Sequence, residues 1–247
     1  MSLLVWGLVT TAALLYLGAA TARSPWPPAR SVAWLAGLGC VAVALTGPLA
    51  HAHADLHAHM AAHLLLGMVG PLLMVLARPG TLLLRALATP AARRVSGVLR
   101  SAPARLLTDP FLATGLNVAG LWLLYRTGLL TEVLHSPGLH LAVSVHVLLS
   151  GWLATAAVLA LDPLAHRRGV AARAVALAVG MAGHDVLAKT LYADPPAGVV
   201  GAEAGARLMY DGGTVVHLLV AAVLWRQWYR SRTAVRDAER VALPTPA

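Results

Sequence analysis

The chain has 247 residues, of which 58% are apolar and only 12% are charged. A soluble domain carries about 25% charged residues, so this composition excludes a water-soluble globule. The net charge of +9 would indicate a nucleic-acid partner in a soluble protein, but here the basic residues must first be located relative to the apolar runs.

A bilayer core about 30 Å thick requires roughly 20 residues of apolar helix. Seven apolar runs meet or approach that length, and they lie at residues 2–20, 31–50, 56–77, 109–126, 138–161, 173–192 and 208–228. We therefore predict an all-α, polytopic membrane protein whose seven-transmembrane-helix bundle forms a single domain over residues 1–230. Residues 231–247 are predicted to be a polar cytoplasmic tail that frays.

The basic residues give the expected orientation. Sixteen of the nineteen fall between runs one and two, three and four, and five and six, or after run seven, which leaves Arg126, Lys189 and Arg207 for the other side. Because Lys- and Arg-rich loops stay in the cytoplasm, we expect the N-terminus outside and the C-terminus inside a bacterial cell membrane. Ala20-Thr21-Ala22 resembles a signal-peptide cleavage site, but no positive charge precedes the first run and cleavage would reverse this orientation.

The connection over residues 80–107 alternates leucine and valine groups with arginines and is interrupted by Pro90. This pattern predicts one or two interfacial helices on the cytoplasmic surface. Their expected partner is the anionic inner leaflet rather than a nucleic acid.

Histidines concentrate on the opposite side of the membrane. Five lie between His51 and His63, and His59 and His63 share one helix face at i,i+4, the spacing by which a helix offers two imidazoles to a metal. At a rise of 1.5 Å per residue, His63, His146, His184 and His217 all lie roughly 9–13 Å below the outer ends of their runs. Intramembrane ionisable side chains are costly and tend to face the bundle interior, so this layer predicts a shared metal site.

The neighbours of these histidines favour copper. Met60 and Met181 add thioethers, and thioether with imidazole suits copper, as Cu(I) or Cu(II). Asp211 and Asp185 are candidates to hold imidazole N–H groups. The remaining candidate ligands are His57 and His140, and the loop from His51 through His53 to His57 is expected to be solvated and to act as a low-affinity entry relay.

Each feature also has a simpler interpretation. A single intramembrane histidine usually makes an interhelical hydrogen bond, and a single methionine usually packs. The common depth of four histidines favours the metal site over these interpretations. The single cysteine, Cys40, allows no disulfide within the chain.

From about residue 56 to 230 the chain resembles the CtaG family of caa3-type cytochrome c oxidase assembly proteins, in an actinobacterial-like form. The most specific match is His59-Met60-Ala61-Ala62-His63, followed by an apolar run to Pro71 and by Arg78-Pro79. Further matches are His140, Val145-His146 before Gly151, Asp162-Pro163, His184, Leu208-Met209-Tyr210, Gly212-Gly213 and Arg226-Gln227-Trp228-Tyr229-Arg230. Three positions depart from the pattern: Ser144 stands for a histidine, Ala188 for a glycine, and Thr214 lies where an acidic residue is expected.

The resemblance implies a non-enzymatic membrane protein that helps to mature a haem-copper oxidase, through copper supply to its copper centres. Its expected partners are oxidase subunits, the lipid bilayer and an extracytoplasmic copper chaperone. Two other classes stay open from the residues alone. Three histidines and an aspartate also suit an intramembrane zinc hydrolase, and two facing histidines suit a bis-histidine haem protein.

Overall fold

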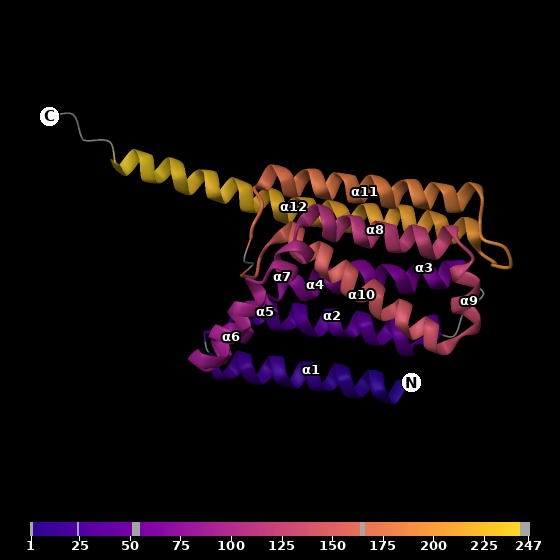
Figure 1. Cartoon of the computed structure of the whole chain (residues 1–247), viewed down its shortest axis with the longest axis horizontal. Coiled ribbons are helices and arrows are strands. Elements are labelled where there is room, and N and C mark those ends of the chain that lie inside the picture. The colour runs from indigo at the N-terminus through magenta and orange to yellow at the C-terminus, as the bar shows by residue number, and fades with distance from the viewer. Residues whose placement is uncertain (1, 24, 51–54, 164–165, 243–247) are drawn as a thin grey trace.

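The long apolar runs of the sequence form a bundle of roughly parallel and antiparallel helices (Figure 1). The structure is a computed structural model that describes residues 2–23, 25–50, 55–163 and 166–242. Its helices are α1 (Ser2–Ala22), α2 (Pro28–Thr46), η1 (Pro48–Ala50), α3 (Leu56–Leu64), η2 (Leu65–Val69), α4 (Gly70–Leu76), α5 (Pro79–Ala86), α6 (Thr89–Leu99), α7 (Ala102–Leu107), α8 (Pro110–Arg126), α9 (Leu129–His135), α10 (Pro137–Leu159), α11 (Val170–Ala193) and α12 (Ala202–Ala242).

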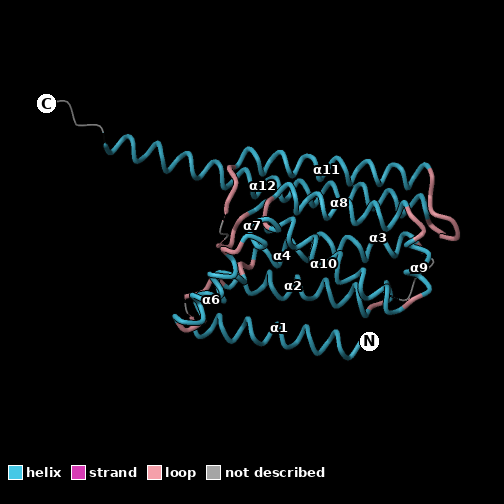
Figure 2. The backbone as a smooth tube through the Cα atoms, in the orientation of Figure 1, coloured by secondary structure: helices cyan, strands magenta, loops and turns pink. Residues whose placement is uncertain are grey.

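The described residues are helical apart from short connections at the two ends of the bundle, which Figure 2 shows as pink segments. Among the described residues, six helices are long and apolar enough to cross a membrane: α1, α2, the continuous Leu56–Leu76 segment, α10, α11 and the Ala202–Thr233 part of α12. This confirms the all-helical fold with six candidate membrane spans. The remaining predicted span is α8, which has 17 residues and packs against α10 and α11.

The sequence predicts that the arginine-rich connections lie on one side and the other connections on the opposite side, and the arrangement of the helices agrees with this. Figure 1 shows α5, α6 and α7 at the same end of the bundle as the C-terminus, whereas the N-terminus and α9 lie at the opposite end. We call the end that carries α5, α6 and α7 the basic end, and we call the opposite end the α9 end. The arginines of the connection between α4 and α8 therefore share one end with the start of α11 and the last turns of α12.

Proline positions explain how the basic end is divided. Here the structure corrects the prediction of one or two helices, because α5, α6 and α7 are three separate helices. Pro79, Pro90 and Pro103 each occupy the first or second position of one of them. Proline has no amide hydrogen to donate and fits the first helical turn, where no intrahelical acceptor is needed. Each proline thus starts a helix and prevents the preceding one from continuing.

Two further helical segments lie outside the predicted spans. The predicted polar tail is helical as far as Ala242. A helix of seven residues, α9, also lies in the connection between α8 and α10.

The helix that carries His63 changes its winding directly after it. Residues Leu65–Val69 form a π-helical turn, and Pro71 follows within α4. Proline at this position cannot donate to the carbonyl of Gly67, the acceptor of a regular α-helix. Gly151 of α10 lies against that carbonyl so closely that a Cβ atom would collide with the Gly67 oxygen. The π turn therefore lets α10 cross the helix at the level of the histidines.

Candidate functional site

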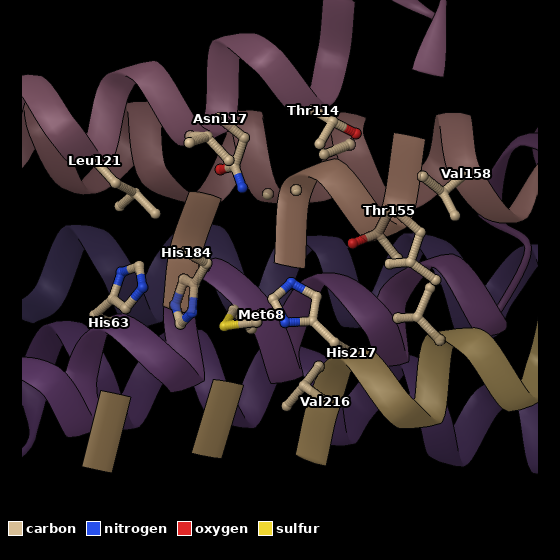
Figure 3. Close-up of a pocket in the computed structure, with 17 residues that line it drawn as sticks. His63, Met68, Thr114, Asn117, Leu121, Thr155, Val158, His184, Val216 and His217 are labelled. Atoms are coloured by element: carbon tan, nitrogen blue, oxygen red, sulfur yellow. The ribbon is translucent and has the colours of Figure 1, made fainter. Parts of the chain in front are cut away.

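A cavity of about 60 Å³ lies inside the bundle, between α3 with η2, α8, α10, α11 and α12. Figure 3 shows three imidazoles at this cavity, from His63, His184 and His217, with the thioether of Met68 lying in the view between the last two. The opposite part of the lining carries Thr114 and other small or apolar side chains of α8 and α10. Five helical segments that lie far apart in the sequence, α3 with η2, α8, α10, α11 and α12, thus line one cavity.

The three imidazoles are close to one another. The rings of His63 and His184 are stacked, with centroids 6.0 Å apart and an interplanar angle of 17°, and the ring of His217 meets that of His184 edge-on at 5.3 Å. His63 is 7% and His184 3% exposed. This proximity requires glycine at position 213 of α12, because a Cβ atom there would collide with the His184 ring.

Several polar atoms of these side chains have no hydrogen-bond partner in the described part of the chain. Among the described residues, neither ring nitrogen of His63 or of His184 has a hydrogen-bond partner, and the same holds for Nδ1 of His217 and Oδ1 of Asp185. Buried polar atoms normally have partners, so an unpaired group needs an explanation such as an ion. These orphaned nitrogens are the atoms with which neutral imidazole binds a metal.

One subset has the spacing of a metal site. A ligand atom from each of His184, Asp185 and His217 lies within 4.8 Å of the other two, and Nδ1 of His184 is 3.7 Å from Oδ1 of Asp185. Two imidazoles and a carboxylate form a donor set that several divalent metals accept, while nearby Met68 adds a soft donor that copper accepts.

A second, smaller cavity of about 40 Å³ lies on the other side of His63. His59, His140, Tyr125 and Ser144 line it together with His63 itself. The Nε2 atom of His59 is 3.1 Å from the Tyr125 hydroxyl, and the two rings meet edge-on. This cavity reaches residues of η1, α9 and the first turn of α10, so it extends to the α9 end of the bundle.

The structure brings some predicted site residues together and separates others. His63, His184 and His217 share the first cavity, and His59 and His140 share the second with His63. His146 is exposed on the surface of α10, where its Nε2 atom would lie 2.6 Å from a Cβ atom placed at Gly120 of α8. Of the four histidines predicted to lie in one layer, His63, His184 and His217 line the same cavity, whereas His146 lines neither cavity.

The remaining candidates lie elsewhere. Met60 is fully buried in an apolar cluster, Met181 lines a surface groove between α11 and α12, and Asp211 and His57 are exposed. His51 and His53 lie outside the described residues, so the entry relay that includes them stays a prediction.

Met68 is the residue that sequence reasoning missed. It follows His63 by five positions, which in a regular α-helix places the two side chains on different faces. The π turn between them changes this relation, and both line the same cavity. Pro71 is the only signal in the sequence for such an irregularity, since a proline within an apolar run interrupts the regular hydrogen-bond pattern.

Comparison with known proteins decides the family. A family model described as "Cytochrome c oxidase caa3 assembly factor" matches residues 12–231. The chain belongs to this family. The match includes every residue of both cavities and confirms the resemblance found in the motifs of the sequence.

The mycobacterial relatives of this chain are much longer than the chain itself. It is 34% identical over 148 residues to uncharacterized protein Mb0105 of Mycobacterium bovis, which covers 56% of this chain and 22% of the relative. Uncharacterized protein ML1998 of Mycobacterium leprae is 33% identical over 152 residues, or 58% of this chain and 23% of the relative. The matched region is thus less than a quarter of either relative. No solved structure matches the chain.

Several family motifs of this chain have structural roles outside the cavities. The Asp162 carboxylate accepts hydrogen bonds from the backbone amides of Gly80 and Thr81, at 3.0 and 2.7 Å, and so caps α5 next to Arg78-Pro79. The Gln227 side chain accepts a hydrogen bond from buried Arg173, which also donates to the last carbonyls of α10. These motifs tie the basic end together.

Charge also links two connections at this end. Arg168 forms an ion pair of 2.7 Å with Asp109, the residue that caps α8. Partial burial alone would raise the pKa of Asp109, but hydrogen bonds from Arg168 and from the backbone amides of Phe111 and Leu112 hold it below its ordinary value. Asp109 is therefore ionised at neutral pH and keeps its pairing with Arg168.

Proposed function

We propose that this protein is a membrane assembly factor for a haem-copper oxidase, which binds copper within its helix bundle and delivers it to the oxidase. In this proposal α8 is the seventh span, since its 17 residues reach the lower limit of about 17 for crossing a bilayer. The α9 end faces outward and the basic end lies in the cytoplasm of a bacterial cell, as the distribution of arginine favours.

One observation carries the proposal. Three buried or half-buried imidazoles converge on a cavity inside an apolar bundle, with ring nitrogens that have no partner among the described residues. Leaving several such groups unpaired in a low-dielectric interior is costly, at about 1–3 kcal/mol for each group. Binding of a cation would offset that cost, so the arrangement favours a ligand-binding site over a purely structural one.

The donor set supports copper as the cargo. Imidazole binds both copper oxidation states, and the thioether of Met68 favours Cu(I). His63, His184, His217 and Asp185 would hold the ion, and Met68 would add its sulfur. A family of oxidase assembly factors suggests a non-catalytic role, and a haem-copper oxidase is a protein that requires copper during maturation.

The test is copper retention by the purified chain. We expect the wild-type protein to retain copper after removal of weakly bound metal, and the double variant His63→Ala with His184→Ala to lose it. His146→Ala is the matched control, because it removes an imidazole at the same depth but outside both cavities. Equal copper retention in the double variant and the control would refute the site.

An intramembrane zinc hydrolase is the second candidate, and the His184–Asp185–His217 group favours it. Two imidazoles and a carboxylate form a ligand set that zinc accepts, with room in the cavity for a water molecule. Metal analysis of protein purified from native membranes separates the two candidates. Bound zinc with hydrolysis of a lipid amide would support the hydrolase, whereas bound copper supports the assembly factor. A cavity of about 60 Å³ gives no support to a haem macrocycle between these helices.

A further inference from the structure

His63 is the only residue that lines both cavities among those described. Its ring stacks on His184 on one side, at 6.0 Å between centroids, and faces Tyr125 edge-on on the other, at 6.3 Å. Both of its nitrogens are without a hydrogen-bond partner in the described part of the chain, although the side chain is almost fully buried. His63 thus occupies the wall between two imidazole-lined spaces.

The two cavities follow one another along the bundle axis. The smaller one is lined by Leu49 of η1, Val133 of α9 and His140 in the first turn of α10, and so begins at the α9 end. The larger one continues past His184 and His217 to Val158 and Val220, farther toward the basic end. A cation that enters at the α9 end meets His140 and His59 first, then His63, and then His184.

We propose that the chain holds copper in two successive sites, an entry site of His59, His140 and His63 and an inner site of His63, His184, His217 and Asp185, with His63 as the ligand common to both. The proposal rests on the proposed function, since it assumes copper as the cargo. It assigns to His63 the role of passing the ion from one cavity to the next.

The transfer is a ligand exchange in which copper keeps its oxidation state. The bonds from copper to the nitrogens of His59 and His140 break as bonds to His184 and His217 form, while the bond to His63 is kept. No electron or proton is required from another molecule. Sharing one ligand means that the ion is never fully released into an apolar interior, where a bare charge is very costly.

The experiment compares the rate of copper loading with the final amount of copper bound. The full chain in detergent is exposed to buffered Cu(I) without oxygen, samples are freed of weakly bound metal at intervals, and copper per protein is measured. The entry variant is His59→Gln with His140→Gln, since glutamine keeps a polar side chain that can still contact Tyr125. The inner variant is His184→Ala with His217→Ala. The control variant is His135→Ala with His146→Ala, which removes two exposed histidines.

We expect the entry variant to load about tenfold more slowly than wild type, a difference of about 1.4 kcal/mol in activation free energy, and to reach the same final copper content. The inner variant should fail to retain copper, and the control should behave as wild type. His63→Ala should show both defects. Gel filtration of each variant confirms that the bundle is folded.

Three results would overturn the proposal, and they differ in what they imply. Loading of the entry variant at the wild-type rate removes the entry site but leaves the inner site in place. Loss of final copper content in the entry variant, equal to that of the inner variant, means that all the histidines form one site. Absence of retained copper in wild type refutes the proposed function itself.

Discussion

The depth of a histidine along a helix and its direction around that helix are separate properties. The sequence predicts similar depths for His146 and His184, but His184 is 3% exposed and His146 is exposed on the outside of α10. The buried residues of α10 recur at Ser144, Val147 and Gly151, a stripe of helical period. Extending this stripe back by four residues reaches His140, which lines the second cavity, and omits His146. The direction of each side chain around its helix, which the structure shows, therefore separates the two histidines.

The thioether of Met68 gives a prediction about a single side chain. Met68→Leu keeps the volume of the side chain, so it should change stability by less than about 1.5 kcal/mol. It should remove the sulfur contribution from the X-ray absorption spectrum of the Cu(I)-loaded protein and weaken Cu(I) binding more than Cu(II) binding.

Met60→Leu is the control for that prediction, because Met60 is buried but lines neither cavity. Retention of the copper–sulfur signal in Met68→Leu, or its loss in Met60→Leu, would show that Met68 is not the sulfur ligand.

At the scale of elements, the site depends on how closely helices approach. α12 passes α11 at Gly213, where a Cβ atom would lie 2.8 Å from Nδ1 of His184 and still closer to another atom of the ring. Small residues allow membrane helices to approach one another closely. The van der Waals contacts made in this way are a main source of helix association in membranes. The same glycine thus contributes both to packing and to the position of a candidate ligand.

Gly213→Ala tests this double role. The added methyl group forces the His184 ring or α12 to shift, and such overpacking costs about 1–3 kcal/mol. We expect a lower unfolding midpoint and lower copper retention in detergent. Gly115→Ala is the matched control on α8, because nothing lies within 4 Å of a Cβ atom at that position. A variant at Gly213 that keeps both the wild-type midpoint and wild-type copper binding would contradict the packing argument.

For the whole molecule, the two ends of the bundle differ in charge and in chemistry. The α9 end leads into the histidine-lined cavities, whereas the basic end carries α5, α6 and α7 with their arginines (Figure 1). Asp162, Arg173 and the Asp109–Arg168 pair hold the basic end together through hydrogen bonds and charge. Copper that arrives from outside the cell would reach the histidines without crossing the basic end, provided that the arginines lie in the cytoplasm.

Labelling of introduced cysteines measures this orientation. In a Cys40→Ser background, Glu132→Cys lies in α9 and Arg93→Cys lies in α6, and both positions are exposed. We expect a membrane-impermeant maleimide to label Glu132→Cys on intact cells, and to label Arg93→Cys only after the membrane is opened. The reverse pattern would place the arginines outside and refute the predicted topology.

Much of the fold was predictable because the bilayer imposes simple requirements on length and polarity. The predicted span over residues 138–161 corresponds to α10 at Pro137–Leu159, and the span over 173–192 corresponds to α11 at Val170–Ala193. Caps and prolines mark the starts, as Ser136 with Pro137 does for α10. The candidate site was less predictable, because Met68 depends on a π turn and His146 on the direction of its side chain.

The sequence by itself determined an apolar, all-helical chain and the end of the bundle where arginine gathers, and it predicted that several histidines share one depth. These properties depend on composition and on distance along the chain, because the bilayer imposes its requirements on each helix separately. Only the tertiary structure decided which imidazoles share a cavity, that Met68 joins them, and that His63 stands between two cavities. Those facts depend on the rotation of each helix against its neighbours. Close packing at positions such as Gly151 and Gly213 sets this rotation.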